Sequence, residues 1–328
     1  TNPGLNDDAI PQGIAVSQDE DLILTSCYMK TNKPSRIYLT NTKNESRYVS
    51  LYQDDKEFKG HVGGIGISNN LVFLANGGYV SIFDLNYLKN ATSRIDLTIK
   101  VKVNGEDGVA SCVFANSKYL FVAEFHDGKN YITNHPIETN DGTYHAICSQ
   151  YKLTDLSTPY RVYSIRNKVQ GFCFTDDGRI VLSTSYGLAD SIYYVYNQDK
   201  IVDSKETYLG APLYKLDSYS KKVKGPAMSE DLDYKDGKVY TLSGYESSEY
   251  LQKIATHINE KIGDFSKQEG YSKLESDMKN ILLAINLSDE YYKAQKVAED
   301  IQKEKEDLEK EIFDMKHDMI AVKTQLEE

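Results

Sequence analysis

The chain of 328 residues contains no tryptophan, and its apolar residues never gather into a long run. The longest apolar run, at 281–285, has five residues, whereas a membrane-spanning helix needs roughly 20. The sequence therefore predicts no membrane span. The missing tryptophan removes the side chain that stacks best on sugars, although Tyr28, Tyr186 and Tyr245 can take its place.

Metal-binding and redox signatures are absent as well. Only four cysteines are present, Cys27, Cys112, Cys148 and Cys173, and none forms a CxxC pair. The histidines show no HxxxH or HxH spacing. Because Cys112 and Cys173 fall in apolar strands of different repeats, we expect buried, reduced thiols. We expect no cofactor; Ca²⁺ held by axial carboxylates is the alternative.

Positive charge is scarce. The net charge is -11, and 288–328 holds thirteen acidic residues against seven basic ones. Such a surface repels phosphate backbones, so the sequence predicts no nucleic-acid partner. No GxSxG elbow, P-loop or GxGxxG turn is present.

What the chain does contain is one motif that returns five times, with copies that begin at Pro11, Val62, Val109, Val169 and Ser229. Each copy has a small-residue turn, an apolar strand, a polar turn and a second apolar strand. A spacing of roughly 45 to 60 residues is typical of a radial β array, in which each unit buries its faces against its neighbours. We therefore predict a mainly β plus α chain. A β-propeller of five blades, with six as the alternative, is followed by a helical, coiled-coil tail.

The predicted domains are a propeller head at 1–246, a helical connector at 247–287 and a coiled-coil helix at 288–328. In the second and fourth blades, the outer strands are expected within 95–103 and at 212–216, where β-branched and aromatic residues are enriched. The fifth copy has only two clear strands. Either the segment 1–10 completes this last blade, or the blade is short and covered by a helix.

The residues just before each first strand line the mouth of a propeller's channel. Aligning the copies places five residues at this position: Gln12, Gly63, Ala110, Gln170 and Glu230. The residues just after the second strands reach the same rim: Ser26, Asn76, Glu124, Thr184 and Ser243. From both sets and their neighbours we select as ligand-binding candidates Gln12, His61, Asn76, Glu124, Gln170, Tyr186, Ser229 and Glu230. The alternative is that these groups only hydrogen-bond neighbouring blades and ordered water.

An enzymatic reading needs paired carboxylates near the axis. If the protein is an enzyme, the candidate catalytic residues are Glu230, Glu124 and His61, with Asp107 or Asp231 as a third acid. Only Glu230 sits at the expected start of a strand. Catalysis is therefore the weaker alternative.

The phrases PQGIAV, GHVGGIGI, VQGFCFTDDGRIVLSTSYG and PAMSEDLDYKDGKVYTLSG resemble a group of bacterial exported β-propeller proteins of unassigned role. More distantly, they are similar to gluconolactonase and strictosidine-synthase-like propellers. The resemblance covers about residues 10 to 250 and excludes the tail. Lactonase-like families hold a catalytic metal with a Glu and Asn or Asp side chains. Only Glu230 and Asn76 match that set, because glutamines stand at Gln12 and Gln170.

In the tail, apolar residues recur at alternating steps of four and three from Leu287 onward, with Lys305 as the one charged position. Such a 3.5-residue period predicts a coiled coil; a helix packed on its own head is the alternative. The oligomerisation candidates are Ile301, Leu308, Ile312, Met315, Met319, Val322 and Leu326. Two shorter helices are expected upstream, with a break at 286–289 and Ser288 as the cap of the long helix.

Our first hypothesis is a non-enzymatic secreted or surface protein. Its head binds a protein or glycan partner, and its coiled coil self-associates or binds a helical partner. A start at Thr1 without Met suits export, with a trimmed chain as the other explanation. The alternatives are a hydrolase acting on a lactone or glycan at the axial mouth, and a cytoplasmic scaffold.

Overall fold

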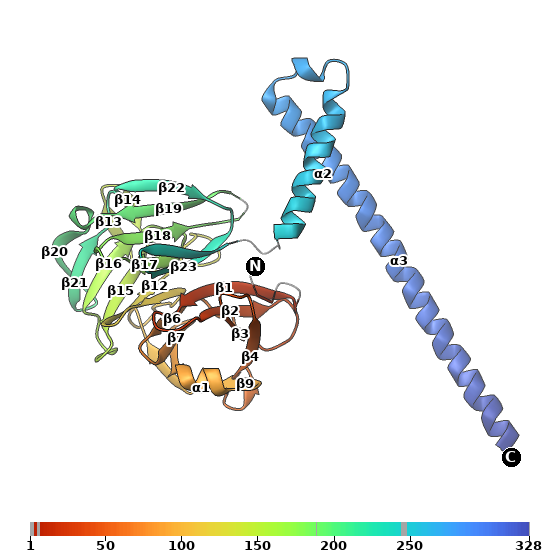
Figure 1. Cartoon of the computed structure of the whole chain (residues 1–328), viewed down its shortest axis with the longest axis horizontal. Coiled ribbons are helices and arrows are strands. Elements are labelled where there is room, and N and C mark those ends of the chain that lie inside the picture. The colour runs from red at the N-terminus through yellow and green to blue at the C-terminus, as the bar shows by residue number, and fades with distance from the viewer. Residues whose placement is uncertain (1–2, 5–6, 188, 244–247, 328) are drawn as a thin grey trace. The chain divides into compact units, whose positions relative to one another are not determined.

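The computed structural model describes residues 3–4, 7–187, 189–243 and 248–327. They form two compact units, Thr1–Ser248 and Glu249–Glu328, called here the head and the tail (Figure 1). The head is a β-propeller-like ring of sheets. Its inner strands follow one another around the ring in the order β1, β6, β11, β17 and β23, and β23 contacts β1 again.

The chain between the last two strands of blade 2 contributes a strand to blade 1. Blade 1 contains β1 (Ala9–Val16), β2 (Ile23–Met29), β3 (Arg36–Thr40), β4 (Ser46–Gln53) and β5 (Lys56–Glu57). Blade 2 contains β6 (Ile65–Ser68), β7 (Leu71–Asn76), β8 (Tyr79–Asp84) and β10 (Ile99–Lys102). The chain leaves β8 through helix α1 (Leu85–Asn90), and β9 (Arg94–Asp96) then pairs in parallel with β4 of blade 1. The segment 95–103 was expected to hold one outer strand of blade 2. It instead contains the end of β9, which joins blade 1, and all of β10, which joins blade 2.

Blades 3 and 4 repeat this arrangement. Blade 3 contains β11 (Cys112–Ala115), β12 (Tyr119–Ala123), β15 (Ala146–Lys152) and β16 (Arg161–Ile165), with the hairpin β13 (Ile137–Thr139) and β14 (Gly142–Tyr144) inserted. Blade 4 contains β17 (Val169–Phe174), β18 (Ile180–Thr184), β19 (Ser191–Tyr196) and β22 (Lys221–Gly225). Between β19 and β22, the strands β20 (Val202–Tyr208) and β21 (Ala211–Lys215) extend blade 3, because β21 pairs in parallel with β16.

The expectation that 212–216 forms the outer strand of blade 4 is therefore wrong. That segment, β21, belongs to blade 3, and the outer strand of blade 4 is β22. The sequence of β22, KKVKG, is exposed at four of its five positions and shows no buried apolar face. Strand propensity alone does not say which sheet a strand joins, so the polar edge strand was missed.

The fifth sheet of the ring is short. Among the described residues it consists of β23 (Ser229–Lys235) and β24 (Lys238–Ser243) alone. Among the described residues, the ring thus has four sheets of four or more strands and one sheet of two strands, apart from the inserted hairpin β13–β14. The described part of 1–10 does not complete this hairpin, because its strand residues Ala9 and Ile10 belong to β1 and pair with β2.

The core lies between neighbouring blades. Leu24 and Ile37 of blade 1 cluster with Leu74 of blade 2. Further clusters join blade 2 to blade 3 and blade 3 to blades 4 and 5; in the latter, Phe121 stacks on Phe172 with centroids 5.4 Å apart. Burial of such side chains contributes roughly 1.5–3 kcal/mol each. All four cysteines are free and buried in the head, as expected.

Closure of the ring between blade 5 and blade 1 is polar. Among the described residues, no hydrophobic cluster spans these two blades. Asp231 Oδ2 accepts from the backbone N–H of Ile14 and of Ile65, at 3.3 Å each. Asp233 Oδ2 accepts from the N–H of Val16 at 2.5 Å. These two buried carboxylates therefore join the last inner strand to the first two.

Glycines on or just before the inner strands allow the backbones of neighbouring blades to approach each other closely. A Cβ atom at Gly171 would lie 2.6 Å from the backbone nitrogen of Leu232. At Gly64 it would lie 2.7 Å from the backbone of Cys112 and 2.8 Å from the carboxylate of Asp231. These glycines stand in the small-residue positions that the repeat predicted near the axis, where backbones approach closely.

The tail is a helical hairpin. Helix α2 (Ser248–Ser266) folds back along the first part of α3 (Ser276–Glu327), where His257 Nε2 lies 2.9 Å from Glu290 Oε2 (Figure 1). Helix α3 runs through 286–289 without a break, so Ser288 is not a helix cap. Asn286 donates from Nδ2 to the carbonyl of Leu282 at 3.0 Å and stays within the helix. None of the described helices combines the length and the apolar character needed to cross a membrane.

Replacing Gly171 with Ala should destabilise the head by about 1–3 kcal/mol, because backbone rather than a flexible side chain blocks the added methyl group. Gly78→Ala is the matched control, since its Cβ would meet only an ordinary contact at 3.4 Å. Chemical denaturation followed by circular dichroism measures both. Equal effects of the two substitutions would contradict the crowded axis.

The ring closure should be sensitive to pH. Burial raises the pKa of Asp233 from 3.8 to about 7. Between these values the unfolded chain loses the proton while the folded head keeps it, so the stability that this group contributes is full at low pH and is lost as the pH rises through about 7. The unfolding free energy of the wild type, minus that of Asp233→Asn, should therefore fall with rising pH by about 1.4 kcal/mol per unit of pKa difference.

Denaturation at several pH values from 4 to 8 tests this, with Asp236→Asn on the exposed turn of the same hairpin as the control. A difference that grows with pH would mean that the ionised carboxylate is the stabilising form.

Candidate functional site

The inner strands begin around an axial pocket of about 450 Å³. It is lined by Gln12, Tyr28, His61, Gly63, Gly77, Val109, Ala110, Ser111, Phe125, Tyr131, Gln170, Ser185, Tyr186, Gly187, Met228 and Glu230. All five residues that the repeat alignment placed before the first strands are among them. Because every blade contributes one of these residues, the pocket exists only when the ring is closed.

Five of the eight candidate ligand-binding residues line this pocket: Gln12, His61, Gln170, Tyr186 and Glu230. The other three belong to the framework. Asn76 donates from Nδ2 to Ser81 Oγ at 3.3 Å. Ser229 is fully buried, and its Oγ lies 2.7 Å from the hydroxyl of Tyr193.

Glu124 is the clearest structural residue of the three. Its side chain is 0% exposed. Its carboxylate accepts from the N–H of Val109 and of Ile147 at 3.2 Å each and lies 3.2 Å from His135 Nε2. His135 Nδ1 in turn lies 2.8 Å from the hydroxyl of Tyr208. Glu124 therefore anchors the strands of blade 3.

In blades 2, 3 and 4, the residues chosen at the ends of the second strands were one position too early. The pocket is lined there by the next residues, Gly77, Phe125 and Ser185. Successive side chains of a strand point to opposite faces, so a shift by one residue turns a framework position into a lining position. In blade 1 the lining residue is Tyr28, two positions after Ser26.

Tyr131 lies in the segment between β12 and β15 of blade 3. This segment is outside the repeated motif, so the alignment of the copies could not identify it. Asp127 holds its loop, since one carboxylate oxygen accepts from the backbone N–H groups of Lys129, Asn130 and Tyr131 at 2.8 to 2.9 Å. The ring of Tyr131 meets Phe125 edge-on, with centroids 5.6 Å apart. The loop thus brings an aromatic side chain to the pocket in a defined position.

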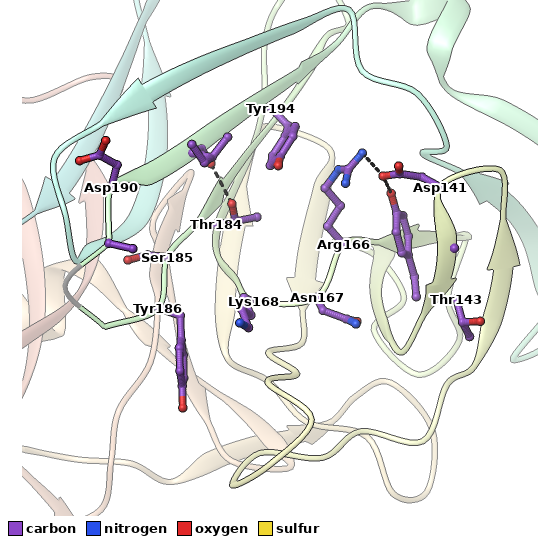
Figure 2. A pocket seen from close by; sticks show the side chains of 14 residues that line it. Asp141, Thr143, Arg166, Asn167, Lys168, Thr184, Ser185, Tyr186, Asp190 and Tyr194 are labelled. Carbon is purple, nitrogen blue, oxygen red and sulfur yellow. Dashed lines mark hydrogen bonds and ion pairs between the residues drawn. The ribbon is translucent and has the colours of Figure 1, made fainter. Parts of the chain in front are cut away.

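A second pocket of about 450 Å³ lies between blades 3 and 4 and shares Ser185 and Tyr186 with the first (Figure 2). In Figure 2, Arg166 points toward Asp141, whereas Tyr186 points away from this pair. Arg166 forms an ion pair with Asp141 and lies over the ring of Tyr194 at 4.3 Å. The guanidinium is therefore engaged by the protein itself.

The axial pocket combines polar and aromatic side chains. Among its described lining residues Glu230 is the one carboxylate, and burial lowers the pKa of His61 below its usual value. Acid–base hydrolysis of glycosides uses two carboxylates, and the second candidate, Glu124, is buried in the framework. Within the described residues no three His, Cys, Asp or Glu side chains are grouped to hold a metal ion.

Residues 236–323 match the family described as "Cell division protein ZapA". This is less than half of the chain, and it spans β24 and most of the tail. No curated protein matches the sequence at a significant level.

Several solved structures are distantly similar. The PQQ-bound aldose sugar dehydrogenase of Streptomyces coelicolor is 12% identical, with 71% of this chain and 74% of that chain covered and a TM-score of 0.40. The acylaminoacyl peptidase of Pyrococcus horikoshii is 11% identical, with 73% and 39% covered and a TM-score of 0.34. The propeller domain of the Trilobed protease from Pyrococcus furiosus is 12% identical, with 74% and 66% covered and a TM-score of 0.33. Likeness at this level carries no inference about function.

Replacing Glu124 with Ala should cost about 3 kcal/mol of stability, because two backbone N–H groups and His135 lose their buried partner. Glu138→Ala, on an exposed position of β13, is the control and should change stability by less than about 0.5 kcal/mol. Thermal unfolding of both variants measures the difference. Unchanged stability of Glu124→Ala would contradict its framework role.

Proposed function

We propose that this protein is a non-enzymatic binding protein in which the head recognises a partner through the axial pocket and the tail joins several chains. Multivalency raises the avidity of weak single-site contacts without any new contact in the site. The partner that we propose for the head is a protein or a glycan.

The observation that carries this proposal is the exposed apolar seam of α3. Ile301, Leu308, Ile312 and Met315 are 47% to 61% exposed, and they follow the a and d positions of one heptad register. Helices that expose such a seam pack it against another helix. The side chains of Met319, Val322 and Leu326, predicted to continue the seam, lie outside the described residues.

A second copy of this chain is the occupant that we propose for the seam. Nearer the start of α3, Met278, Ile281 and Ile285 are also 53% to 60% exposed, but they fall at b and e positions of this register and do not belong to the seam. Residues 236–323 match a cell division protein family, which is compatible with assembly rather than turnover. We therefore propose cell division as a process in which the assembly acts.

Hydrolysis is the less supported alternative, since the described residues of the pocket lining include one carboxylate, Glu230, instead of two. Location at the cell surface or outside the cell stays a prediction, as does the cytoplasmic scaffold that would replace it.

Light scattering on the intact protein and on a chain that ends at residue 248 tests the assembly. We expect the intact protein to be oligomeric and the head to be monomeric. The double substitution Leu308→Asn and Ile312→Asn should dissociate the oligomer, because it places amides in the apolar seam. Lys303→Asn with Lys310→Asn, on the opposite side of the heptad, is the matched control and should leave the mass unchanged. A monomeric intact protein at tens of micromolar, or equal behaviour of the two variants, would contradict the proposal.

A further inference from the structure

The wall of the axial pocket carries aromatic rings from three blades. Tyr28 comes from blade 1, Phe125 and Tyr131 from blade 3, and Tyr186 from blade 4. Tyr28 also packs against His61, with ring centroids 4.8 Å apart. The face of an aromatic ring carries partial negative charge and attracts cations.

The formal charge of the described lining is negative. It includes Glu230 and contains no Lys or Arg. Glu230 is only 7% exposed. Burial raises the pKa of Tyr28, and the charge of Glu230 raises it further, so the carboxylate and this phenol lie near each other in the same pocket.

We propose that the axial pocket binds an organic ammonium group, with Glu230 as the opposite charge and with Tyr28, Phe125, Tyr131 and Tyr186 around the ligand. This inference rests on the proposed recognition function of the head and names the chemistry that the head recognises. A cavity of about 450 Å³ is within the range of small-molecule sites, roughly 300 to 1,000 Å³.

Other ligand classes fit the lining less well. An anion would meet the carboxylate of Glu230, and the part of the lining that the structure describes has no Lys or Arg to bind it. A neutral sugar can stack on the aromatic rings, but it carries no charge to pair with Glu230. The protein itself already places an ammonium on one of these rings, since Lys168 Nζ lies 4.7 Å from the ring centroid of Tyr186. Lys168 lines the second pocket, which shares Tyr186 with the first.

Two sources supply this chemistry: a free quaternary amine, and the side chain of a lysine or methylated lysine on a partner. Ligand-observed NMR on the intact protein compares them, with choline as the free amine and N-acetyl-lysine methylamide, unmodified and trimethylated, as the peptide form. The neutral isostere of choline, 3,3-dimethylbutan-1-ol, and methyl glucoside are the uncharged probes.

We expect choline or one of the lysine compounds to bind at least about tenfold more tightly than the neutral isostere, because the carboxylate and the aromatic rings both attract a cation. Glu230→Gln should weaken cation binding about tenfold and leave the isostere unchanged. Tyr131→Ala should weaken it about fivefold, whereas Tyr131→Phe, which keeps the ring, should stay within about twofold. Tyr79→Ala, on an exposed tyrosine outside the pocket, is the control.

Equal binding of choline and its isostere would overturn the proposal, and this comparison needs no variant to fold. Binding of methyl glucoside without any cation would overturn it too, but would leave the recognition function of the head intact. Tight cation binding that Glu230→Gln and Tyr131→Ala do not change would place the cation elsewhere. The mass measured by light scattering tests the assembly separately, so that failure of the ligand class and failure of the proposed function are distinguishable.

Discussion

The closure of the ring by two buried carboxylates is the interaction on which the head depends. Neighbouring blades elsewhere are held by apolar clusters, but blade 5 meets blade 1 through Asp231 and Asp233. Each accepts backbone N–H groups from a strand more than 150 residues away in sequence. A hairpin of two strands has little area to bury, so directed hydrogen bonds replace part of the missing apolar contact.

The axial pocket is a consequence of this closure. Each inner strand contributes one lining residue at or near its start, and Glu230 lies beside Asp231 on β23. The strand that completes the ring therefore also supplies the one carboxylate among the described lining residues. Loss of the closure would remove the site and the scaffold together, which links the stability of the head to recognition.

Much of this arrangement could be predicted from the sequence. The five copies of the motif predicted the ring and the axial position of Gln12, Gln170 and Glu230, because each copy repeats one physical constraint. They left open whether the last blade is short or is completed by residues 1–10. Prediction failed where the sequence pattern depends on neighbouring residues but the structure depends on residues distant in sequence. The segments around Ile95 and Pro212 read as strands, yet the sheet they join depends on partners distant in sequence. Glu124 lies one residue from the pocket lining and belongs to the framework.

In the tail, the heptad period predicted a long helix, but Ser288 is not a cap, since no Gly or Pro interrupts α3 nearby. A capping residue alone does not end a helix where neither Gly nor Pro is nearby, because the other residue types cost well under 1 kcal/mol each in a helix.

Hydrogen exchange at the backbone amides of Ile14, Val16 and Ile65 in the intact protein tests the ring closure most directly. These amides donate to Asp231 and Asp233, so we predict exchange as slow as that of the core strands. Exchange at the rate of exposed turns would mean that the carboxylates do not close the ring, and it would remove the basis for the axial site.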